Sequence, residues 1–317
     1  MNSYFLKKSK FSNTRTFLLP LFFLIPASFL IAKPPTVAQT YKEPQYKLGI
    51  FWPALTSMIL PGFDQYWEGE YGAGASYSSL FMAGAFIAAA NPKEVTLDET
   101  DEDGGIQFGY YDVGTSMMNS AGLLSAYHSF KTAVKSRKSD FYFIKNEDSF
   151  ADLLTAPFDF SFLSRPSTYV PLGIIGITAG AFLSSLDKEQ RASSPLGERV
   201  ISTFAISYGA GVGEEAAFRG WLLPVSHYAL NSPLLGNILQ GTVFGALHYS
   251  SQNRLPLVQT VLGNYWGWLT QENGYSIKET IFQHFWWDVI VIGSILLSNI
   301  KLETSPSIQL PPISIQW

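Results

Sequence analysis

The sequence predicts an all-α fold, a polytopic membrane bundle of about eight helical spans, and three observations support this prediction. Of the 317 residues, 47% are hydrophobic and only 15% are charged, whereas a soluble domain carries about 25% charged residues. Apolar runs with the approximate length of a membrane helix recur along the chain. The loops between them differ in the sign of their charge, as loops on opposite faces of a membrane do. The lipid bilayer is therefore an expected partner.

Net charge and cysteine content exclude several functions. The formal net charge of −4 is small, so we do not expect nucleic acid as a partner. The chain has no cysteine, which excludes disulfides, thiol proteases and thiolate zinc sites. Any metal would have to be held by His, Asp or Glu side chains. The sequence also lacks the His-Glu-x-x-His, Gly-x-Ser-Gly and Gly-x-Gly-Asp motifs, which argues against three other classes of intramembrane protease.

The first 38 residues have the layout of a signal peptide or an N-terminal anchor. An apolar stretch at 17–32 follows four basic residues, and small residues follow it at 36–38. The stretch is short for a span and contains Pro20 and Pro26, which favours a signal peptide over an uncleaved anchor.

The remaining apolar runs are the candidate spans. The first of them contains Pro53 and is short, so it is either a full crossing or a re-entrant segment. Residues 149–167 alternate between apolar and polar character and are predicted to lie at the membrane interface. The candidate spans are 48–62, 72–90, 110–130, 169–186, 200–223, 234–249, 255–269 and 277–300.

The charged loops predict the orientation in the membrane. Residues 131–145 are rich in lysine and arginine, which places this loop in the cytoplasm, and the acidic loop at 91–107 then lies outside. The N-terminal basic segment is also cytoplasmic if 48–62 crosses the membrane completely. We therefore expect a multi-pass protein of the bacterial inner membrane, with its C-terminus outside.

Three charges interrupt the apolar run at 200–223, and they call for an explanation. Each charge costs about 2.5–3.5 kcal/mol at the centre of a bilayer on insertion scales. Glu215 and Arg219 are i,i+4 neighbours in the favourable order on a helix and can form an ion pair. Glu214 points about 100° away from Glu215 and has no local partner. A carboxylate in that setting suits a general acid or base.

Two histidines lie in later apolar runs, each with a neighbour four residues away. Phe244 and His248 share one helical face, as do His284 and Asp288. Asp288 can accept a hydrogen bond from one ring nitrogen of His284 and so fix the orientation of the ring. Three C-terminal helices thus supply ionisable groups, and gathering these groups in one polar cavity lowers the cost of burying them.

These motifs resemble the CPBP family of intramembrane proteases, also called the Abi or CAAX-protease family. Its motifs are Glu-Glu-x-x-x-Arg, Phe-x-x-x-His, and His-x-x-x-Asn or a similar residue, and they match Glu214 to Arg219, Phe244 to His248, and His284 to Asp288. The resemblance covers about residues 150–300. It implies an intramembrane endopeptidase whose substrate is a membrane-associated protein or peptide.

The resemblance also implies roles for individual residues. Glu214 and His248 would activate a water molecule, with Glu215, Arg219 and Phe244 as supporting residues. His284 and the residue four positions later would stabilise the oxyanion or help to hold a metal. Zn²⁺ bound by Glu214, His248 and His284 would leave one position for water, and the same residues could instead work without metal.

One position departs from the CAAX-cleaving members of the family. Asp288 stands where they have Asn, and an ionised Asp cannot donate a hydrogen bond to an oxyanion. Asp288 would then orient His284 or act as a ligand. This departure weakens a specific CAAX interpretation more than the general interpretation as a protease.

The predicted organisation has four parts. Residues 1–38 are the signal peptide or anchor, and 39–148 are an N-terminal membrane region of unknown role. Residues 149–300 are the CPBP-like protease domain, and 301–317 are a C-terminal tail.

Other interpretations remain open at this point. The glutamates and Arg219 could form a structural ion-pair network, and the histidines could be packing residues or an interhelical polar clamp. The whole protein would then be a catalytically silent scaffold or an immunity protein of the kind that protects against bacteriocins. A transporter is a further alternative, although the chain lacks the two related halves typical of one. The other histidines, His128 and His227, are predicted to be interfacial, and the tryptophans to be belt or packing residues.

Overall fold

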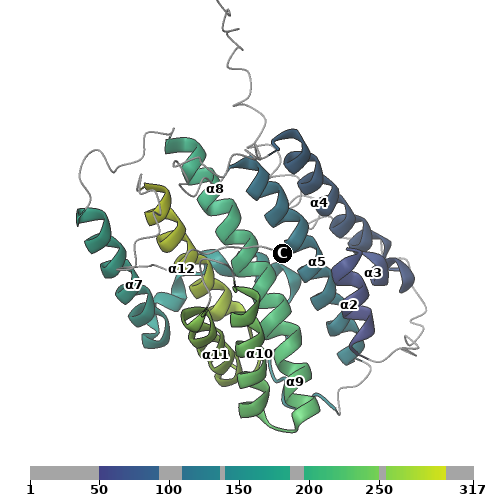
Figure 1. The fold of residues 1–317 in the computed structure, drawn as a ribbon. Coiled ribbons are helices and arrows are strands. Elements are labelled where there is room, and N and C mark those ends of the chain that lie inside the picture. Colours follow the sequence, from purple (N-terminus) through teal and green to yellow (C-terminus); the bar gives the residue numbers. More distant parts are fainter. Residues whose placement is uncertain (1–49, 93–108, 136–139, 186–195, 250–254, 298–317) are drawn as a thin grey trace, which may run out of the picture. The chain divides into compact units, whose positions relative to one another are not determined.

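The computed structural model describes residues 50–92, 109–135, 140–185, 196–249 and 255–297, and every regular element in these ranges is a helix (Figure 1). The all-α prediction is therefore confirmed for the described part of the chain. The described helices belong to one compact unit, Glu43–Trp317. The predicted signal or anchor segment (1–38) and C-terminal tail (301–317) lie outside the described residues. The boundary predicted between residues 148 and 149 stays a prediction.

The first apolar run, 48–62, forms two short helices with a turn between them. These are α2 (Trp52–Ile59) and α3 (Phe63–Trp67). The 8 residues of α2 extend about 12 Å at the α-helical rise, whereas the hydrocarbon core of a bilayer is about 30 Å thick. Helix α2 is too short for the full crossing that the predicted N-terminal topology requires.

The next two runs form a packed pair of long helices, α4 (Tyr71–Ala90) and α5 (Tyr110–Lys135). A Cβ atom added to Gly84 would lie 2.5 Å from the carbonyl oxygen of Gly114. Small residues at this crossing therefore let the two backbones approach closely, as in membrane helix pairs. The structure extends the second run beyond the predicted end at 130, so that α5 includes the first basic residues of the following loop.

The predicted interfacial segment consists of short helical turns. It forms α6 (Phe150–Thr155), η1 (Ala156–Phe158) and η2 (Phe160–Ser164). A capping box starts α6, with Ser149 Oγ accepting a hydrogen bond from the backbone amide of Asp152 at 3.1 Å. The segment leads into α7 (Pro166–Ser185), as the sequence predicted.

A single long helix carries the Glu-Glu-x-x-x-Arg motif through the middle of the bundle (Figure 1). It begins as α8 (Leu196–Gly209) and continues as two π-helical stretches, η4 (Ala210–Glu214) and η5 (Ala216–Leu222). It ends as α9 (Leu223–Leu230). The predicted run at 200–223 is therefore the central part of a longer helix, whose middle is wider than an α-helix.

Three more helices complete the described chain. They are α10 (Pro233–Leu247), α11 (Leu257–Glu272) and α12 (Lys278–Leu297), close to the runs predicted from the sequence. Helices α10 and α11 pack against each other, and α12 packs against both α7 and α8. Among the motif-bearing elements, the long central helix contacts both of the others: η4 packs against α12, and η5 packs against α10.

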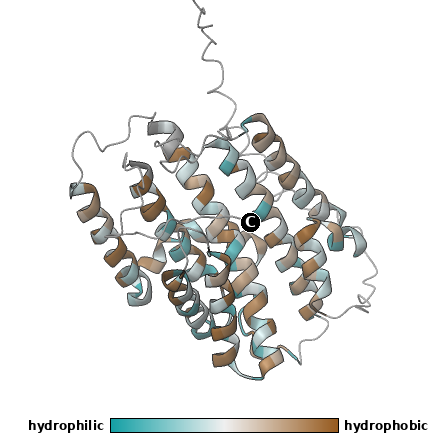
Figure 2. Ribbon diagram, viewed as in Figure 1, coloured by the Kyte–Doolittle hydropathy of each residue, from teal (hydrophilic) through white to brown (hydrophobic). Residues whose placement is uncertain are grey.

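Two helices of the described part, α4 and α7, are long and apolar enough to cross a membrane. Apolar residues predominate along both of them (Figure 2). On α7 the side chains of Ile174 and Ile177 are 62% and 77% exposed, as lipid-facing residues would be. Membrane association fits these helices, while the count of about eight spans stays a prediction.

Candidate active site

The two adjacent glutamates lie where the long helix changes from α to π geometry. Glu214 is the last residue of η4, and Glu215 joins it to η5. Both side chains are buried, with residue exposures of 5% and 0%. Short π-helical segments inside α-helices occur frequently at functional sites. The two adjacent buried carboxylates thus lie in the π-helical part of the helix.

Glycines let neighbouring helices come close to this stretch. A Cβ atom on Gly211 would lie 2.9 Å from the backbone nitrogen of Phe285 in α12, and one on Gly209 would lie 2.2 Å from Ser116 Oγ in α5. Gly213 faces α5 as well, at Ser120. The glycine-rich sequence before the glutamates therefore positions α12, which carries His284, directly against the helix that carries Glu214.

Glu215 connects the first and third motifs through one oxygen atom. Its Oε1 lies 2.8 Å from Arg219 Nη1 and 2.8 Å from His284 Nδ1. The ion pair predicted from i,i+4 spacing is therefore present, and the same carboxylate also holds the imidazole. Nδ1 donates its proton to Glu215. The opposite edge of the His284 ring, which carries Nε2, faces the other acidic groups.

Glu214 and Asp288 lie at the Nε2 edge of His284. Glu214 Oε2 is 3.9 Å from Nε2, and Asp288 Oδ2 is 3.5 Å from it. Both distances exceed that of an ordinary hydrogen bond. Within the described residues, Glu214 Oε2 is buried and has no hydrogen-bond partner. A buried acceptor of this kind, beside an imidazole, is what a reacting water molecule would need.

The expected role of Asp288 as the group that orients His284 needs a correction. The orienting hydrogen bond comes from Glu215, on the opposite ring nitrogen. Helical spacing placed His284 and Asp288 on one face correctly, but it could not show that a carboxylate from another helix lies closer to the ring.

His248 lies at the end of α10, beside Phe244. Its Nδ1 is 2.8 Å from the Phe244 carbonyl oxygen, and the two rings are 4.7 Å apart between centroids. The Phe244 ring is also in edge contact with His284, at 6.0 Å. His248 is half-buried and follows the last residue of α10. Phe244 thus contacts both histidines, as well as Phe218 in the first motif helix.

Trp266 also belongs to this site, although from the sequence it was expected only to be a membrane-belt or packing residue. Its ring stacks on His284, with centroids 4.4 Å apart and planes inclined by 23°. The residue is only 2% exposed. It also lies beneath the guanidinium group of Arg219, at 5.3 Å. Trp266 therefore restricts the position of the His284 ring from one face.

Arg219 is fully buried, and its surroundings explain how a charge can lie there. Besides the ion pair with Glu215, its Nη2 donates to the Gly263 carbonyl at 3.2 Å. Its guanidinium lies 4.3 Å from the centroid of the Phe244 ring. A paired, hydrogen-bonded arginine over aromatic faces is the usual form in which this charge is buried.

The other two histidines lie elsewhere in the fold. His128 pairs with Glu70 at 2.9 Å and contacts the hydroxyl of Tyr77. His227 is hydrogen-bonded to the hydroxyl of Tyr275 and stacks on Phe143. Neither takes part in the cluster around Glu214, and the interfacial roles expected of them stay predictions.

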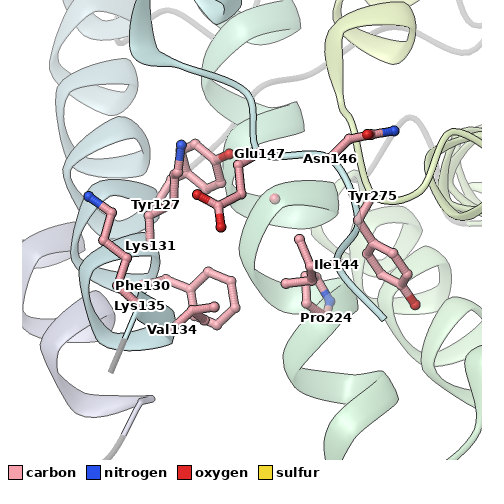
Figure 3. Close-up of a pocket in the computed structure, with 11 residues that line it drawn as sticks. Tyr127, Phe130, Lys131, Val134, Lys135, Ile144, Asn146, Glu147, Pro224 and Tyr275 are labelled. Atoms are coloured by element: carbon pink, nitrogen blue, oxygen red, sulfur yellow. The ribbon is translucent and has the colours of Figure 1, made fainter. Parts of the chain in front are cut away.

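The structure also contains a hollow apart from these residues (Figure 3). It lies between α5, the start of α9 and the loop at 144–147, with Lys131, Lys135 and Glu147 among its lining residues. None of the proposed catalytic residues lines it, so it is not the candidate active site.

A catalytic zinc site needs about three protein donor groups close together. In the part of the chain that the structure describes, no three His, Asp or Glu side chains form a group arranged to hold a metal ion. Zinc bound by Glu214, His248 and His284 therefore stays a prediction.

Comparison with known proteins adds one match. Residues 196–290 match the family model described as Rce1-like, type II CAAX prenyl endopeptidase. This segment runs from the start of α8 into α12 and contains Glu214, His248, His284 and Asp288. No curated protein and no solved structure matches the chain.

Proposed function

Residues 196–290 form an Rce1-like segment, which confirms the resemblance to the CPBP family, and from this premise we propose that the chain is an intramembrane endopeptidase. It hydrolyses a peptide bond of a membrane-associated protein or peptide, within or near the membrane. The observation that carries the proposal is the buried Glu214 carboxylate beside His284, with Oε2 3.9 Å from Nε2.

In the proposed reaction, Glu214 is the general base. It takes a proton from a water molecule, and the resulting hydroxide attacks the carbonyl carbon of the scissile bond. His248 contacts the same water: because its Nδ1 donates to Phe244, its Nε2 is the acceptor that orients the nucleophile. Glu214 then passes its proton to the leaving amine, so that protons balance over the cycle.

His284 stabilises the oxyanion that forms on the substrate. In its doubly protonated form, Nδ1 donates to Glu215 and Nε2 donates to the oxyanion. Asp288, 3.5 Å from Nε2, adds a polar group at the same edge of the ring. Arg219 and Trp266 keep Glu215 and the ring in position. An oxyanion donor is effective only when it is held in place before the reaction. Losing one such donor typically costs about 10²–10³ in kcat.

The first experiment compares membranes that contain the wild-type chain with membranes that contain Glu214→Gln or His248→Ala. New peptide termini in membrane proteins are measured by mass spectrometry. The matched control is Glu272→Gln, the same change at an exposed position at the end of α11. We expect cleavage products with the wild type and Glu272→Gln, and their loss with both site variants. Full cleavage by either site variant would refute its proposed role and favour the scaffold interpretation.

Zinc is tested by measuring bound metal in the purified protein. One zinc per chain that is lost in His248→Ala and kept in Glu272→Gln would support the predicted ligand set. Zinc retained in the His248→Ala variant would remove His248 from that set.

A further inference from the structure

The segment α2–α3 lies outside the Rce1-like region, and its packing against α5 assigns it a place in the bilayer. We infer that α2 and α3 form a re-entrant hairpin, which enters one leaflet and leaves on the same face, with lipid acyl chains covering its outer side. The inference is independent of the proposed proteolysis, because it rests only on the N-terminal helices.

The depth of the hairpin is measured along α5, which contains the predicted span at 110–130. The end of α2 reaches the middle of α5, where a Cβ atom on Gly122 would lie 2.4 Å from the Met58 carbonyl oxygen. Between Lys131 and Gly122, α5 extends about 14 Å along its axis, about half the thickness of a hydrocarbon core. The tip of the hairpin therefore stops near mid-membrane.

Both ends of the hairpin lie beside the last turns of α5. At the start of α2, Ile50 and Ala54 belong to one apolar cluster with Phe130 and Ala133. After α3, Glu70 Oε2 pairs with His128 Nε2 at 2.9 Å. The chain thus comes in and goes out at the same level, the level of the lysine-bearing end of α5.

The backbone of the turn is satisfied by serine side chains, as a membrane-buried turn requires. Gly62 N donates to Ser125 Oγ at 2.9 Å, and the Pro61 carbonyl accepts from Ser78 Oγ at 2.9 Å. At the start of α3, the amide of Asp64 donates to Ser57 Oγ at 3.1 Å. Three different helices provide these serines, so this part of the turn does not need water.

Gln65 and two serines of α5 fasten the hairpin from inside. Gln65 Nε2 donates to the Ser125 carbonyl at 3.1 Å and to Ser129 Oγ at 2.9 Å, and Gln65 Oε1 accepts from Ser125 Oγ at 2.7 Å. Gln65 is 2% exposed. Both the oxygen and the nitrogen of the Gln65 side-chain amide are hydrogen-bonded to α5. These bonds hold α3 against α5 as the returning arm of the hairpin, rather than as the start of a span.

The outer surface of the hairpin changes in character with depth. Ile59 and Leu60 at the tip are 69% and 58% exposed, while Trp52 and Trp67 at the two ends are 55% and 78% exposed. Tryptophan concentrates at the membrane interface, and aliphatic side chains face the hydrocarbon. With tryptophans at both ends and aliphatic residues at the tip, the exposed side chains fit a hairpin that enters and leaves a single leaflet on the same side.

A re-entrant hairpin and a full crossing place Trp52 on different faces of the membrane. If α2 crossed the membrane, Trp52 would lie on the face opposite Tyr142, which belongs to the loop after α5. In a re-entrant hairpin, Trp52 and Tyr142 lie on the same face, and Asn91 at the end of α4 lies on the other.

The natural chain has no cysteine, which makes a direct test available. Trp52→Cys, Tyr142→Cys and Asn91→Cys are produced singly and labelled with a membrane-impermeant maleimide in sealed vesicles of one orientation. We expect Trp52→Cys and Tyr142→Cys to react from the same side, and Asn91→Cys from the other. Reaction of Trp52→Cys from the Asn91 side would overturn the inference, as would reaction of all three from both sides of intact vesicles.

Depth is measured with a nitroxide attached at Leu60→Cys. Lipid-dissolved oxygen should relax this label at least several-fold more strongly than a water-soluble nickel complex does, and a label at Tyr142→Cys, 78% exposed, should show the reverse. A nickel response at residue 60 equal to that at 142 would refute burial in the leaflet. Neither readout involves cleavage, so failure of this inference and failure of the proposed protease activity can be told apart.

Discussion

The carboxylate of Glu215 holds the imidazole of His284, with Oε1 2.8 Å from Nδ1. The same oxygen also pairs with the buried Arg219. One side chain thereby joins the helix that carries Glu214, the proposed general base, to the helix that carries His284, the proposed oxyanion group.

Substitution of Glu215 should affect both stability and the site. Glu215→Ala leaves the fully buried Arg219 without its carboxylate, and removing one partner of a buried pair costs about 3–5 kcal/mol. Glu215→Gln keeps an oxygen that can accept a hydrogen bond but removes the charge, so we expect a smaller loss. Thermal unfolding in detergent measures both, with Glu272→Gln as the control. Equal stability of Glu215→Ala and wild type would contradict the connection.

Asp288→Asn should retain cleavage, because Asp288 does not provide the orienting hydrogen bond to His284. The amide also restores the donor that the CAAX-cleaving pattern has at this position. Asp288→Ala should reduce kcat by about 10-fold or more, since it removes a polar group at the Nε2 edge. Cleavage kinetics of the two variants check this. A complete loss in Asp288→Asn would show that the negative charge itself is needed.

Trp266 should act as a positioning residue through its stacking on His284. Trp266→Ala removes a buried aromatic side chain and should cost about 3–5 kcal/mol of stability. Trp266→Phe keeps an aromatic face, so the protein should remain folded while kcat falls more than KM changes. A kinetic comparison of Trp266→Phe with wild type separates these effects. An unchanged kcat would limit Trp266 to a packing role.

Gly211→Ala should displace α12, because its Cβ would lie 2.9 Å from the backbone of Phe285. Backbone atoms cannot move aside as a flexible side chain can, so we expect lower stability and loss of cleavage. Gly180→Ala in α7 is the matched control, since no atom lies within 4 Å of an added Cβ there. Unfolding temperature and cleavage are measured for both. Similar behaviour of the two variants would contradict the close helix contact.

Much of the helical architecture followed from local pattern. The apolar runs predicted α4, α7, α10, α11 and α12 with ends close to those observed, because hydrophobic length and flanking polar residues are properties of the segment itself. The same reasoning found the pair of Glu215 and Arg219, since i,i+4 neighbours meet on any helix. The segment that matches the family model, residues 196–290, likewise contains the motifs that were recognised in the sequence.

Other features depended on contacts between segments that lie far apart in the sequence. The run at 48–62 contained no signal that chose between a crossing and a re-entrant hairpin. The inference of a hairpin depends on serines of α4 and α5 that hydrogen-bond to its turn. The π-helical geometry around Glu214 also had no pattern of its own, and it accompanies the close approach of α5 and α12.

Hydropathy and residue spacing act within one segment, so they were enough to predict which helices form and which of them carry acidic and imidazole groups. Only the packed helices show that Glu215, rather than Asp288, hydrogen-bonds to His284, and that Trp266 stacks on its ring. Those choices depend on how each helix is rotated about its axis and how closely neighbouring backbones pack. Rotation and packing are set by glycine contacts and buried hydrogen bonds between helices, which no single segment contains.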